Sequence, residues 1–192
     1  MNKPIIIQGA LQSELDYLLN NLTLTKKTYI GNFLFYECTY KNYPIIVSKT
    51  KMGEISSAIA TTLAIQTYSP KFIINQGTAG AYAEWLNKGD IVLGEEFYYI
   101  SQFSTDENKE NEEINPWKQK EYRTIDNEIV SYNANQNLIN WLKSLESLNS
   151  ENVYFGTIGS GDVWTKDLKQ IKKFYNDFNI LCEAMECSGA YI

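Results

Sequence analysis

The stretch Phe72-Ile73-Ile74-Asn75-Gln76-Gly77-Thr78-Ala79-Gly80 decides the predicted fold. Its first four residues form a short apolar run, which is typical of a buried strand. The two glycines that follow predict a tight turn at the end of that strand. Backbone N–H groups in such a turn, together with the Thr78 hydroxyl, are suited to a polar ligand. The stretch therefore predicts a buried strand that ends in a candidate binding loop, and a plain strand-exit turn is the alternative.

The same pattern of strand, turn and helix recurs on both sides of this stretch. Residues 4–8 form an apolar run closed by Gly9, and leucines at helical spacing follow it. Further strands are expected at 33–40, 43–48, 91–93 and 153–158 and from residue 180, the first two as a hairpin, with helices at 53–67, 135–145 and 166–174. This alternation predicts an α/β fold, a three-layer α/β/α sandwich around a central mixed sheet, formed by one domain over residues 1–192.

Composition restricts the classes of function. A chain of 192 residues with a net charge of −6 lacks the clustered Lys and Arg that nucleic acid requires. No signal peptide or membrane-spanning run is evident, so a cytoplasmic protein is expected. The three cysteines lack metal-ligand spacing and the chain has no His, so no metal and no cofactor are expected. Without His, acid–base chemistry falls to carboxylates. Residues 101–119 are rich in Asp, Glu, Asn and Lys and are expected to form an exposed loop.

Three further segments place chemically useful side chains after strands. Glu14 lies one turn into the helix that follows Gly9, at the edge where open α/β sheets hold ligands. Trp164 stands in the segment after the strand at 153–158, where its ring could face a purine. Met185 and Glu186 follow the last strand. The alternatives are a solvated helix glutamate for Glu14, a core side chain for Trp164 and, for the nearby Asp162, a helix cap.

These motifs occur together in an order that resembles a known family. The chain carries Gly9-Ala10-Leu11-x-x-Glu14, Asn75-x-Gly77-Thr78-Ala79-Gly80, Lys88-Gly89-Asp90-Ile91-Val92, Ser160-Gly161-Asp162-x-Trp164 and Met185-Glu186. In order and rough spacing they resemble the nucleoside phosphorylase/nucleosidase superfamily, most of all the 5′-methylthioadenosine/S-adenosylhomocysteine nucleosidases. The resemblance runs from residue 4 to the end of the chain, and it implies hydrolysis of a purine nucleoside to a free base and a ribose derivative.

The resemblance also implies a role for each candidate site residue. Glu14 matches the carboxylate that positions and deprotonates the attacking water, and Met185 and Glu186 match the pair that holds the ribose hydroxyls. Thr78 stands in place of a Ser that faces the ribosyl ring, and Trp164 in place of an aromatic residue beside the purine. The catalytic candidates are thus Glu14 and Glu186, and the substrate-binding candidates are Leu11, Met52, Thr78, Ala79, Gly80, Val163, Trp164 and Met185. All are expected at the carboxyl ends of the strands, where Glu14, Thr78, Trp164, Met185 and Glu186 would line one crevice.

Water is favoured over phosphate as the nucleophile. Phosphate binding calls for Arg, and the only Arg in the chain, Arg123, follows the acidic loop. Lys49 and Lys51 keep phosphorolysis open as an alternative, because Lys also binds phosphate. A nucleoside-binding protein without activity is the second alternative.

Two departures from the family pattern bear on that second alternative. Ala184 stands where the nucleosidases have an acidic residue. The resemblance also implies a further strand, a helix and an Asp that protonates the leaving purine, all beyond Ile192, so the chain is expected to be incomplete at its C-terminal side. The family further implies a homodimer, for which Tyr82 and Trp85 are candidate exposed aromatic residues, with a core position as the equal alternative for both.

Overall fold

The computed structural model describes residues 2–101, 130–148 and 151–191. Apart from Ser101, the loop expected at 101–119 lies outside the described residues, as does Arg123. The chain forms two compact units. The first unit comprises Met1–Gly80 and Ala184–Ile192, and the second unit comprises Ala81–Glu183. The single domain expected from the sequence stays a prediction.

The first unit is built on a five-stranded mixed sheet. Its strands lie in the order β2-β3-β4-β1-β5. They are β1 (Ile5–Gly9), β2 (Thr23–Ile30), β3 (Phe33–Tyr40), β4 (Tyr43–Lys49) and β5 (Phe72–Asn75). Strand β1 runs parallel to β4 and to β5, whereas β3 is antiparallel to β2 and β4. The carboxyl ends of β1, β4 and β5 therefore meet at one edge of this sheet, where ligands are expected in an α/β fold.

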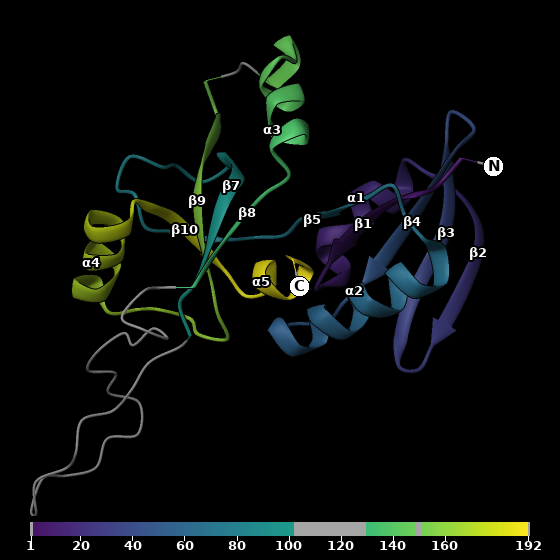
Figure 1. Ribbon diagram of the computed structural model, residues 1–192, viewed down its shortest axis with the longest axis horizontal. Coiled ribbons are helices and arrows are strands. Elements are labelled where there is room, and N and C mark those ends of the chain that lie inside the picture. Colours follow the sequence, from purple (N-terminus) through teal and green to yellow (C-terminus); the bar gives the residue numbers. More distant parts are fainter. Residues whose placement is uncertain (1, 102–129, 149–150, 192) are drawn as a thin grey trace, which may run out of the picture. The chain divides into compact units, whose positions relative to one another are not determined.

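Helices cover both faces of the sheet in the first unit, as Figure 1 shows. They are α1 (Gln12–Asn20) and α2 (Glu54–Tyr68), with the short α5 (Cys187–Tyr191) beside α2. Side chains alternate between the faces of a strand. Leu15 of α1 accordingly packs with Tyr36, Cys38, Ile45 and Val47, and Ala64 of α2 packs with Ile6, Phe35 and Ile46. The α/β class and its mixed sheet are confirmed, with the helix, sheet and helix layers visible in the first unit.

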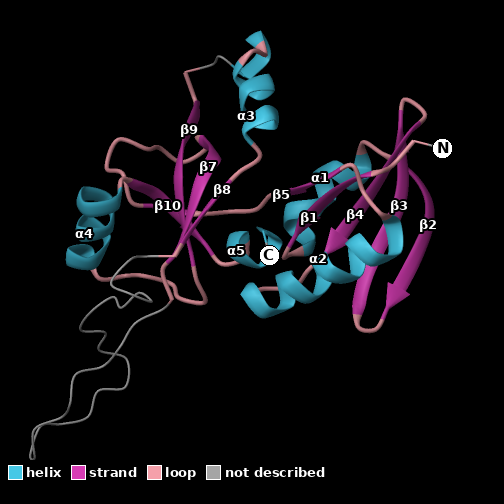
Figure 2. Ribbon diagram, in the orientation of Figure 1, coloured by secondary structure: helices cyan, strands magenta, loops and turns pink. Residues whose placement is uncertain are grey.

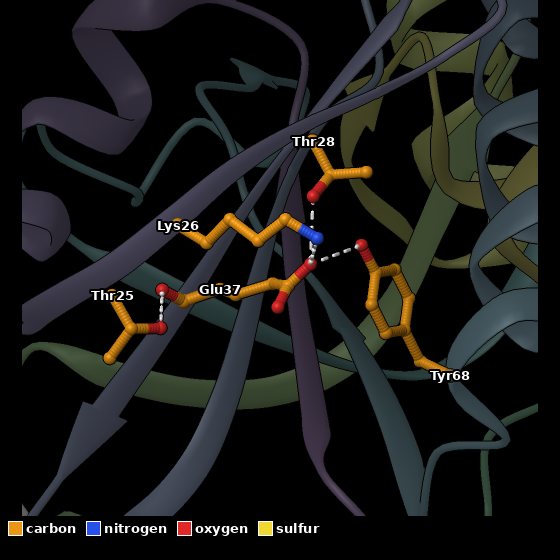
Figure 3. A network of polar contacts seen from close by, with 5 residues as sticks. All are labelled: Thr25, Lys26, Thr28, Glu37 and Tyr68. Carbon is orange, nitrogen blue, oxygen red and sulfur yellow. Dashed lines mark hydrogen bonds and ion pairs between the residues drawn. The ribbon is translucent and has the colours of Figure 1, made fainter.

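A polar network around Glu37 ties strand β2 to the rest of the sheet (Figure 3). Glu37 Oε1 accepts hydrogen bonds from the Thr28 hydroxyl at 2.8 Å and the Tyr68 phenol at 3.4 Å, and it lies 3.7 Å from Lys26 Nζ. The Thr25 hydroxyl donates to the Glu37 carbonyl at 2.7 Å. Most β2 side chains are exposed, so this strand buries little apolar surface. The polar contacts add to the small stabilisation that this burial provides.

The second unit holds another five-stranded mixed sheet, shown with its helices in Figure 2. Its order is β6-β10-β9-β7-β8. The strands are β6 (Gly80–Ala81), β7 (Ile91–Tyr99), β8 (Ser131–Asn133), β9 (Val153–Ser160) and β10 (Ile180–Ala184). Its helices are α3 (Gln136–Lys143), a 3-10 turn at Glu146–Leu148 and α4 (Leu168–Phe178). Strand β7 is parallel to β9 and antiparallel to β8.

The core of the second unit decides between the two alternatives for Tyr82. Tyr82 is buried with Ile100, Phe174 and Ile180, and its ring stacks on Phe174 with centroids 5.7 Å apart. Of the two alternatives for Tyr82, the core position is therefore the correct one. Trp85 is 45% exposed, and its indole N–H donates to the Tyr175 hydroxyl at 3.2 Å.

Most predicted elements are confirmed within a few residues, including the hairpin of β3 and β4 and the helix α2. Strand β2 and the short strands β6 and β8 were missed, and β7 continues to Tyr99 rather than ending at residue 93. Among the described residues, no helix has the length and apolar character required to cross a membrane.

Candidate active site

The Glu14 carboxylate is held where strands β1 and β5 end. Its Oε2 accepts hydrogen bonds from the backbone N–H groups of Ala10 and Leu11, each at 3.0 Å. Its Oε1 accepts from the backbone N–H of Thr78 at 2.9 Å and from the Thr78 hydroxyl at 3.0 Å. Glu14 and Thr78 are 64 residues apart, and the parallel pairing of β1 with β5 brings them together.

The turn after β5 fits closely around the start of α1. A Cβ atom on Gly77 would lie 3.0 Å from Glu14 Oε1, so a larger residue there would displace the carboxylate or the turn. The Gln76 side chain donates to the Glu14 carbonyl at 2.7 Å. The turn is therefore fitted to Glu14, which a plain strand-exit turn would not require.

Glu14 also contributes to the start of its own helix. Leu11 is the N-cap residue of α1, and its N–H is one of the donors to Glu14 Oε2. This contact satisfies a free donor of the first helical turn. One carboxylate oxygen of Glu14 therefore fits the alternative of a glutamate favoured at a helix N-terminus. The other oxygen binds Thr78, which that alternative does not explain.

Glu186 is held at the start of α2, also in the first unit. Its Oε1 accepts the backbone N–H of Gly53 at 3.0 Å, and its carbonyl accepts the Ser57 hydroxyl at 3.0 Å. Gly53 is the N-cap of α2 and has a φ of +94°, which glycine adopts without strain. A carboxylate is favoured at a helix N-terminus by the helix dipole. Met52 precedes Gly53 and is 61% exposed, while Met185 is half-buried.

Close packing of α5 on α2 fixes the segment that carries Glu186. A Cβ atom on Gly189 would lie 2.3 Å from the Glu54 carbonyl oxygen, so only glycine allows this approach. The Ser188 hydroxyl donates to the Glu54 carboxylate. Asn75 Nδ2 at the end of β5 lies 3.7 Å from Cys187 Sγ in the same helix. The residues on either side of Glu186 are thus held by α2 and β5.

The two lysines considered for phosphate binding already contact other side chains. Lys49 Nζ lies 3.4 Å from Gln12 Oε1, which also accepts the Tyr36 phenol at 3.2 Å. Lys51 Nζ lies 5.2 Å from the centroid of the Phe33 ring, in a cation–π contact.

Trp164 belongs to the second unit and stands in the segment between β9 and α4. Its side chain is 77% exposed, so the alternative of a core tryptophan is wrong. Lys166 Nζ lies 5.7 Å from the centroid of its ring. The interpretation of Asp162 as a helix cap was also wrong, because Asp167 caps α4 by accepting the Lys169 N–H at 2.8 Å. Val163 is half-buried in this segment.

The structure thus groups the candidate residues within each unit. The first unit holds Leu11, Glu14, Met52, Thr78, Ala79, Gly80, Met185 and Glu186, and the second holds Val163 and Trp164. Within this set, hydrogen bonds join Glu14 to Leu11 and to Thr78. The expected convergence of all five lining residues stays a prediction. Residues 2–101, 130–148 and 151–191 contain no group of three or more Cys, Asp or Glu placed to hold a metal ion.

The sequence interpretation overlooked Glu183. This residue is only 6% exposed, and its carboxylate accepts hydrogen bonds from Tyr82 and Thr165. The signal for it is an acidic residue within the apolar run of β10, since a buried carboxylate requires hydrogen-bond partners.

Comparison with solved structures identifies the fold. A Helicobacter pylori 5′-methylthioadenosine/S-adenosylhomocysteine nucleosidase, solved with butyl-thio-DADMe-Immucillin-A, has the same fold with a TM-score of 0.80 and 19% sequence identity. The match covers all of this chain and 78% of that one. The fold is therefore that of the purine nucleosidases.

Sequence comparison identifies the family. Residues 4–192 match the model of the phosphorylase superfamily, and the chain belongs to that family. A 5′-methylthioadenosine/S-adenosylhomocysteine nucleosidase from an Exiguobacterium species is 29% identical over 174 residues, which are 90% of this chain and 70% of that protein. The nucleosidase of that name from Bacillus subtilis is 28% identical over 189 residues, which are 98% of this chain and 77% of that protein.

Proposed function

We propose that this protein hydrolyses the N-glycosidic bond of a purine nucleoside of the methylthioadenosine/S-adenosylhomocysteine type. Water is the nucleophile, and the products are the free purine base and a ribose derivative. The names of the sequence relatives support this substrate class. The observation that carries the proposal is the Glu14 carboxylate fixed by four donors at the carboxyl ends of β1 and β5.

Glu14 acts as the general base in this proposal. Cleavage of the bond between C1′ and the purine nitrogen leaves positive charge on the ribose, and a water molecule then attacks C1′. Glu14 orients that water and takes one of its protons, which general-base catalysis requires. The Thr78 hydroxyl, bonded to the same carboxylate, lies next to the ribosyl ring. The departing purine takes up a proton as its bond to C1′ breaks.

Glu186 holds the ribose hydroxyls, and Met185 and Met52 contact the ribosyl part of the substrate. The Glu186 carboxylate keeps one oxygen on the Gly53 N–H, so its position is set before substrate arrives. Leu11, Ala79 and Gly80 contribute the walls and backbone of the turns around Glu14. Val163 and the exposed Trp164 ring provide the surface for the purine base, since aromatic rings stack on planar bases.

Phosphorolysis is less well supported by the donors around Glu14. The backbone N–H groups of Ala10, Leu11 and Thr78 are suited to an anion, and all three already donate to Glu14. A phosphate bound there would have to displace the carboxylate. Lys49 and Lys51 remain the candidate phosphate ligands of this alternative.

The remaining parts of the proposal concern the setting of the enzyme. We infer a cytoplasmic homodimer in methionine salvage that acts on a small nucleoside, with no cofactor, metal, nucleic acid or membrane partner. The family resemblance supports the dimer, and the exposed Trp85 is a candidate for its interface. Sedimentation at micromolar concentration should give the mass of a dimer, and a stable monomer would contradict this part.

The release of free adenine from methylthioadenosine, with and without phosphate, tests the proposed function. We expect release at the same rate in both conditions, because water rather than phosphate attacks C1′. Release that requires phosphate would identify a phosphorylase. Tight binding of the nucleoside without release would identify a binding protein.

A further inference from the structure

The second unit contains a buried carboxylate that the proposed function does not use. Glu183 lies on β10 and is 6% exposed. Its Oε1 accepts the backbone N–H of Thr165 at 2.8 Å, and its Oε2 accepts the Thr165 hydroxyl at 2.8 Å. The Tyr82 phenol also donates to Oε2. Both carboxylate oxygens therefore bind Thr165, which fixes its backbone and its side chain together.

Thr165 is the residue directly after Trp164. The segment between β9 and α4 carries the exposed Trp164, whereas Thr165 next to it is 8% exposed. A side chain that is 77% exposed has little packing of its own to fix its position. On the C-terminal side of Trp164, the backbone is held by the hydrogen bonds from Thr165 to Glu183 and by the Asp167 cap on α4.

Fixing this backbone has a consequence for binding a planar base. A side chain that is disordered before binding loses conformational freedom when the ligand orders it, and that loss weakens affinity. The backbone next to Trp164, which Glu183 holds through Thr165, has less of that freedom to lose when a ligand binds. Glu183 would therefore raise affinity without touching the ligand.

We propose that Glu183 is a positioning residue that acts through Thr165 to hold Trp164 ready for the purine base. This inference rests on the proposed function, in which Trp164 contacts the base. Glu183 does not replace the acidic residue expected at position 184, because adjacent strand residues point to opposite faces of a sheet. Its carboxylate is instead directed to Thr165 and Tyr82.

The hydrogen bonds of Glu183 allow a matched pair of test variants. Thr165→Val removes the hydroxyl bond to Glu183 and keeps the size of the side chain. Tyr82→Phe removes a bond to the same carboxylate and keeps the ring that stacks on Phe174, while both Thr165 contacts remain. A role limited to stability predicts similar effects from the two variants. The positioning role predicts an effect from Thr165→Val alone.

The first readout is the mobility of Trp164 in the free protein. The indole N–H signal of Trp164, assigned in an NMR spectrum by its loss in Trp164→Phe, should broaden or weaken in Thr165→Val. It should remain unchanged in Tyr82→Phe. This readout does not depend on any enzymatic activity, so it distinguishes failure of this inference from failure of the proposed function.

The second readout is the balance of KM against kcat for methylthioadenosine. We expect KM to rise about fivefold to tenfold in Thr165→Val with kcat within about twofold, and both to stay near the unsubstituted values in Tyr82→Phe. Glu183→Leu should raise KM further. Glu183→Gln should keep KM close to the unsubstituted value, because its amide oxygen can still accept the Thr165 N–H. Should Glu183→Leu fail to fold, the Thr165 and Tyr82 pair decides.

Two results would overturn the proposal. One is a Trp164 signal that responds equally to Thr165→Val and Tyr82→Phe, or to neither. The other is a mobile Trp164 with an unchanged KM. If the unsubstituted protein neither binds nor cleaves a nucleoside, the proposed function fails and the assignment of Glu183 as a positioning residue for a base fails with it, while the NMR readout still decides whether Glu183 fixes Trp164.

Discussion

Glu14 in the first unit and Glu183 in the second are both carboxylates that accept several hydrogen bonds, yet their surroundings differ. Glu14 is half-buried at the edge where β1 and β5 end, and Glu183 is 6% exposed within β10. Each takes a backbone N–H and a hydroxyl from one threonine, Thr78 or Thr165. In our proposals, the same bonding prepares a half-buried carboxylate for chemistry in one unit and holds the segment of an exposed tryptophan in the other.

The largest effect is expected at Glu14, where it tests whether this carboxylate takes part in the chemistry. Glu14→Gln should reduce base release by on the order of a hundredfold or more while nucleoside binding is retained, because the amide cannot accept a proton from water. Steady-state kinetics with methylthioadenosine and calorimetric binding would measure the two quantities. Glu37→Gln is the matched control, since Glu37 is also half-buried and hydrogen-bonded in the first unit. Unchanged turnover in Glu14→Gln would remove Glu14 from the chemistry.

The next effect concerns Glu186. Glu186→Gln should weaken ribose recognition and turnover together, by roughly tenfold to a hundredfold in kcat/KM, because the hydroxyl contacts tighten in the transition state. Kinetics with a nucleoside and with its 2′-deoxy analogue would measure this. The loss should be smaller for the deoxy analogue. Equal losses of kcat/KM for both substrates would show that Glu186 does not bind the 2′-hydroxyl.

The apolar elements of the fold could be read from the sequence because burial leaves a periodic pattern. Strands β1, β5 and β9 are apolar runs bounded by turn residues, and α2 is rich in small apolar side chains. Strand β2 was missed because most of its side chains are exposed, so it carries no such pattern. Its place depends on pairing with β3 and on the Glu37 contacts, which are visible only in three dimensions.

The candidate site was predictable where motifs follow strand ends. The positions of Glu14 and Thr78 followed from the rule that parallel strands present their carboxyl ends at one edge. The role of Gly53 as a donor to Glu186, across 133 residues, could not be read from the sequence. Glu183 was overlooked because its neighbours Met185 and Glu186 carried the motif.

A smaller effect is expected where α5 packs on α2. Gly189→Ala should destabilise the protein by about 1–3 kcal/mol, because the added methyl group overlaps the Glu54 carbonyl oxygen and forces the helices apart. Urea denaturation would measure the change. The same substitution should also lower activity, since α5 follows Glu186 directly. An unchanged unfolding midpoint would show that α5 does not pack as described.

The smallest effect concerns Tyr68 at the Glu37 network. Burial and then the Glu37 charge raise the pKa of Tyr68 above its usual value of 10.0. Because the folded-state pKa lies above the unfolded one, the associated stability is present below about pH 10 and is lost as pH rises through the folded pKa. Glu37→Gln should therefore lower the pKa of Tyr68, followed by NMR of labelled tyrosine rings. A higher pKa in the variant would contradict the assigned contact.

The position of water in a complex tests the central claim about Glu14 most directly. A crystal structure with an uncleavable methylthioadenosine analogue should show one water molecule about 2.6–3.2 Å from a Glu14 carboxylate oxygen and facing C1′ of the ribose. Such a water would confirm Glu14 as the group that prepares the nucleophile. A bound analogue whose C1′ lies away from Glu14, with no water between them, would contradict the account.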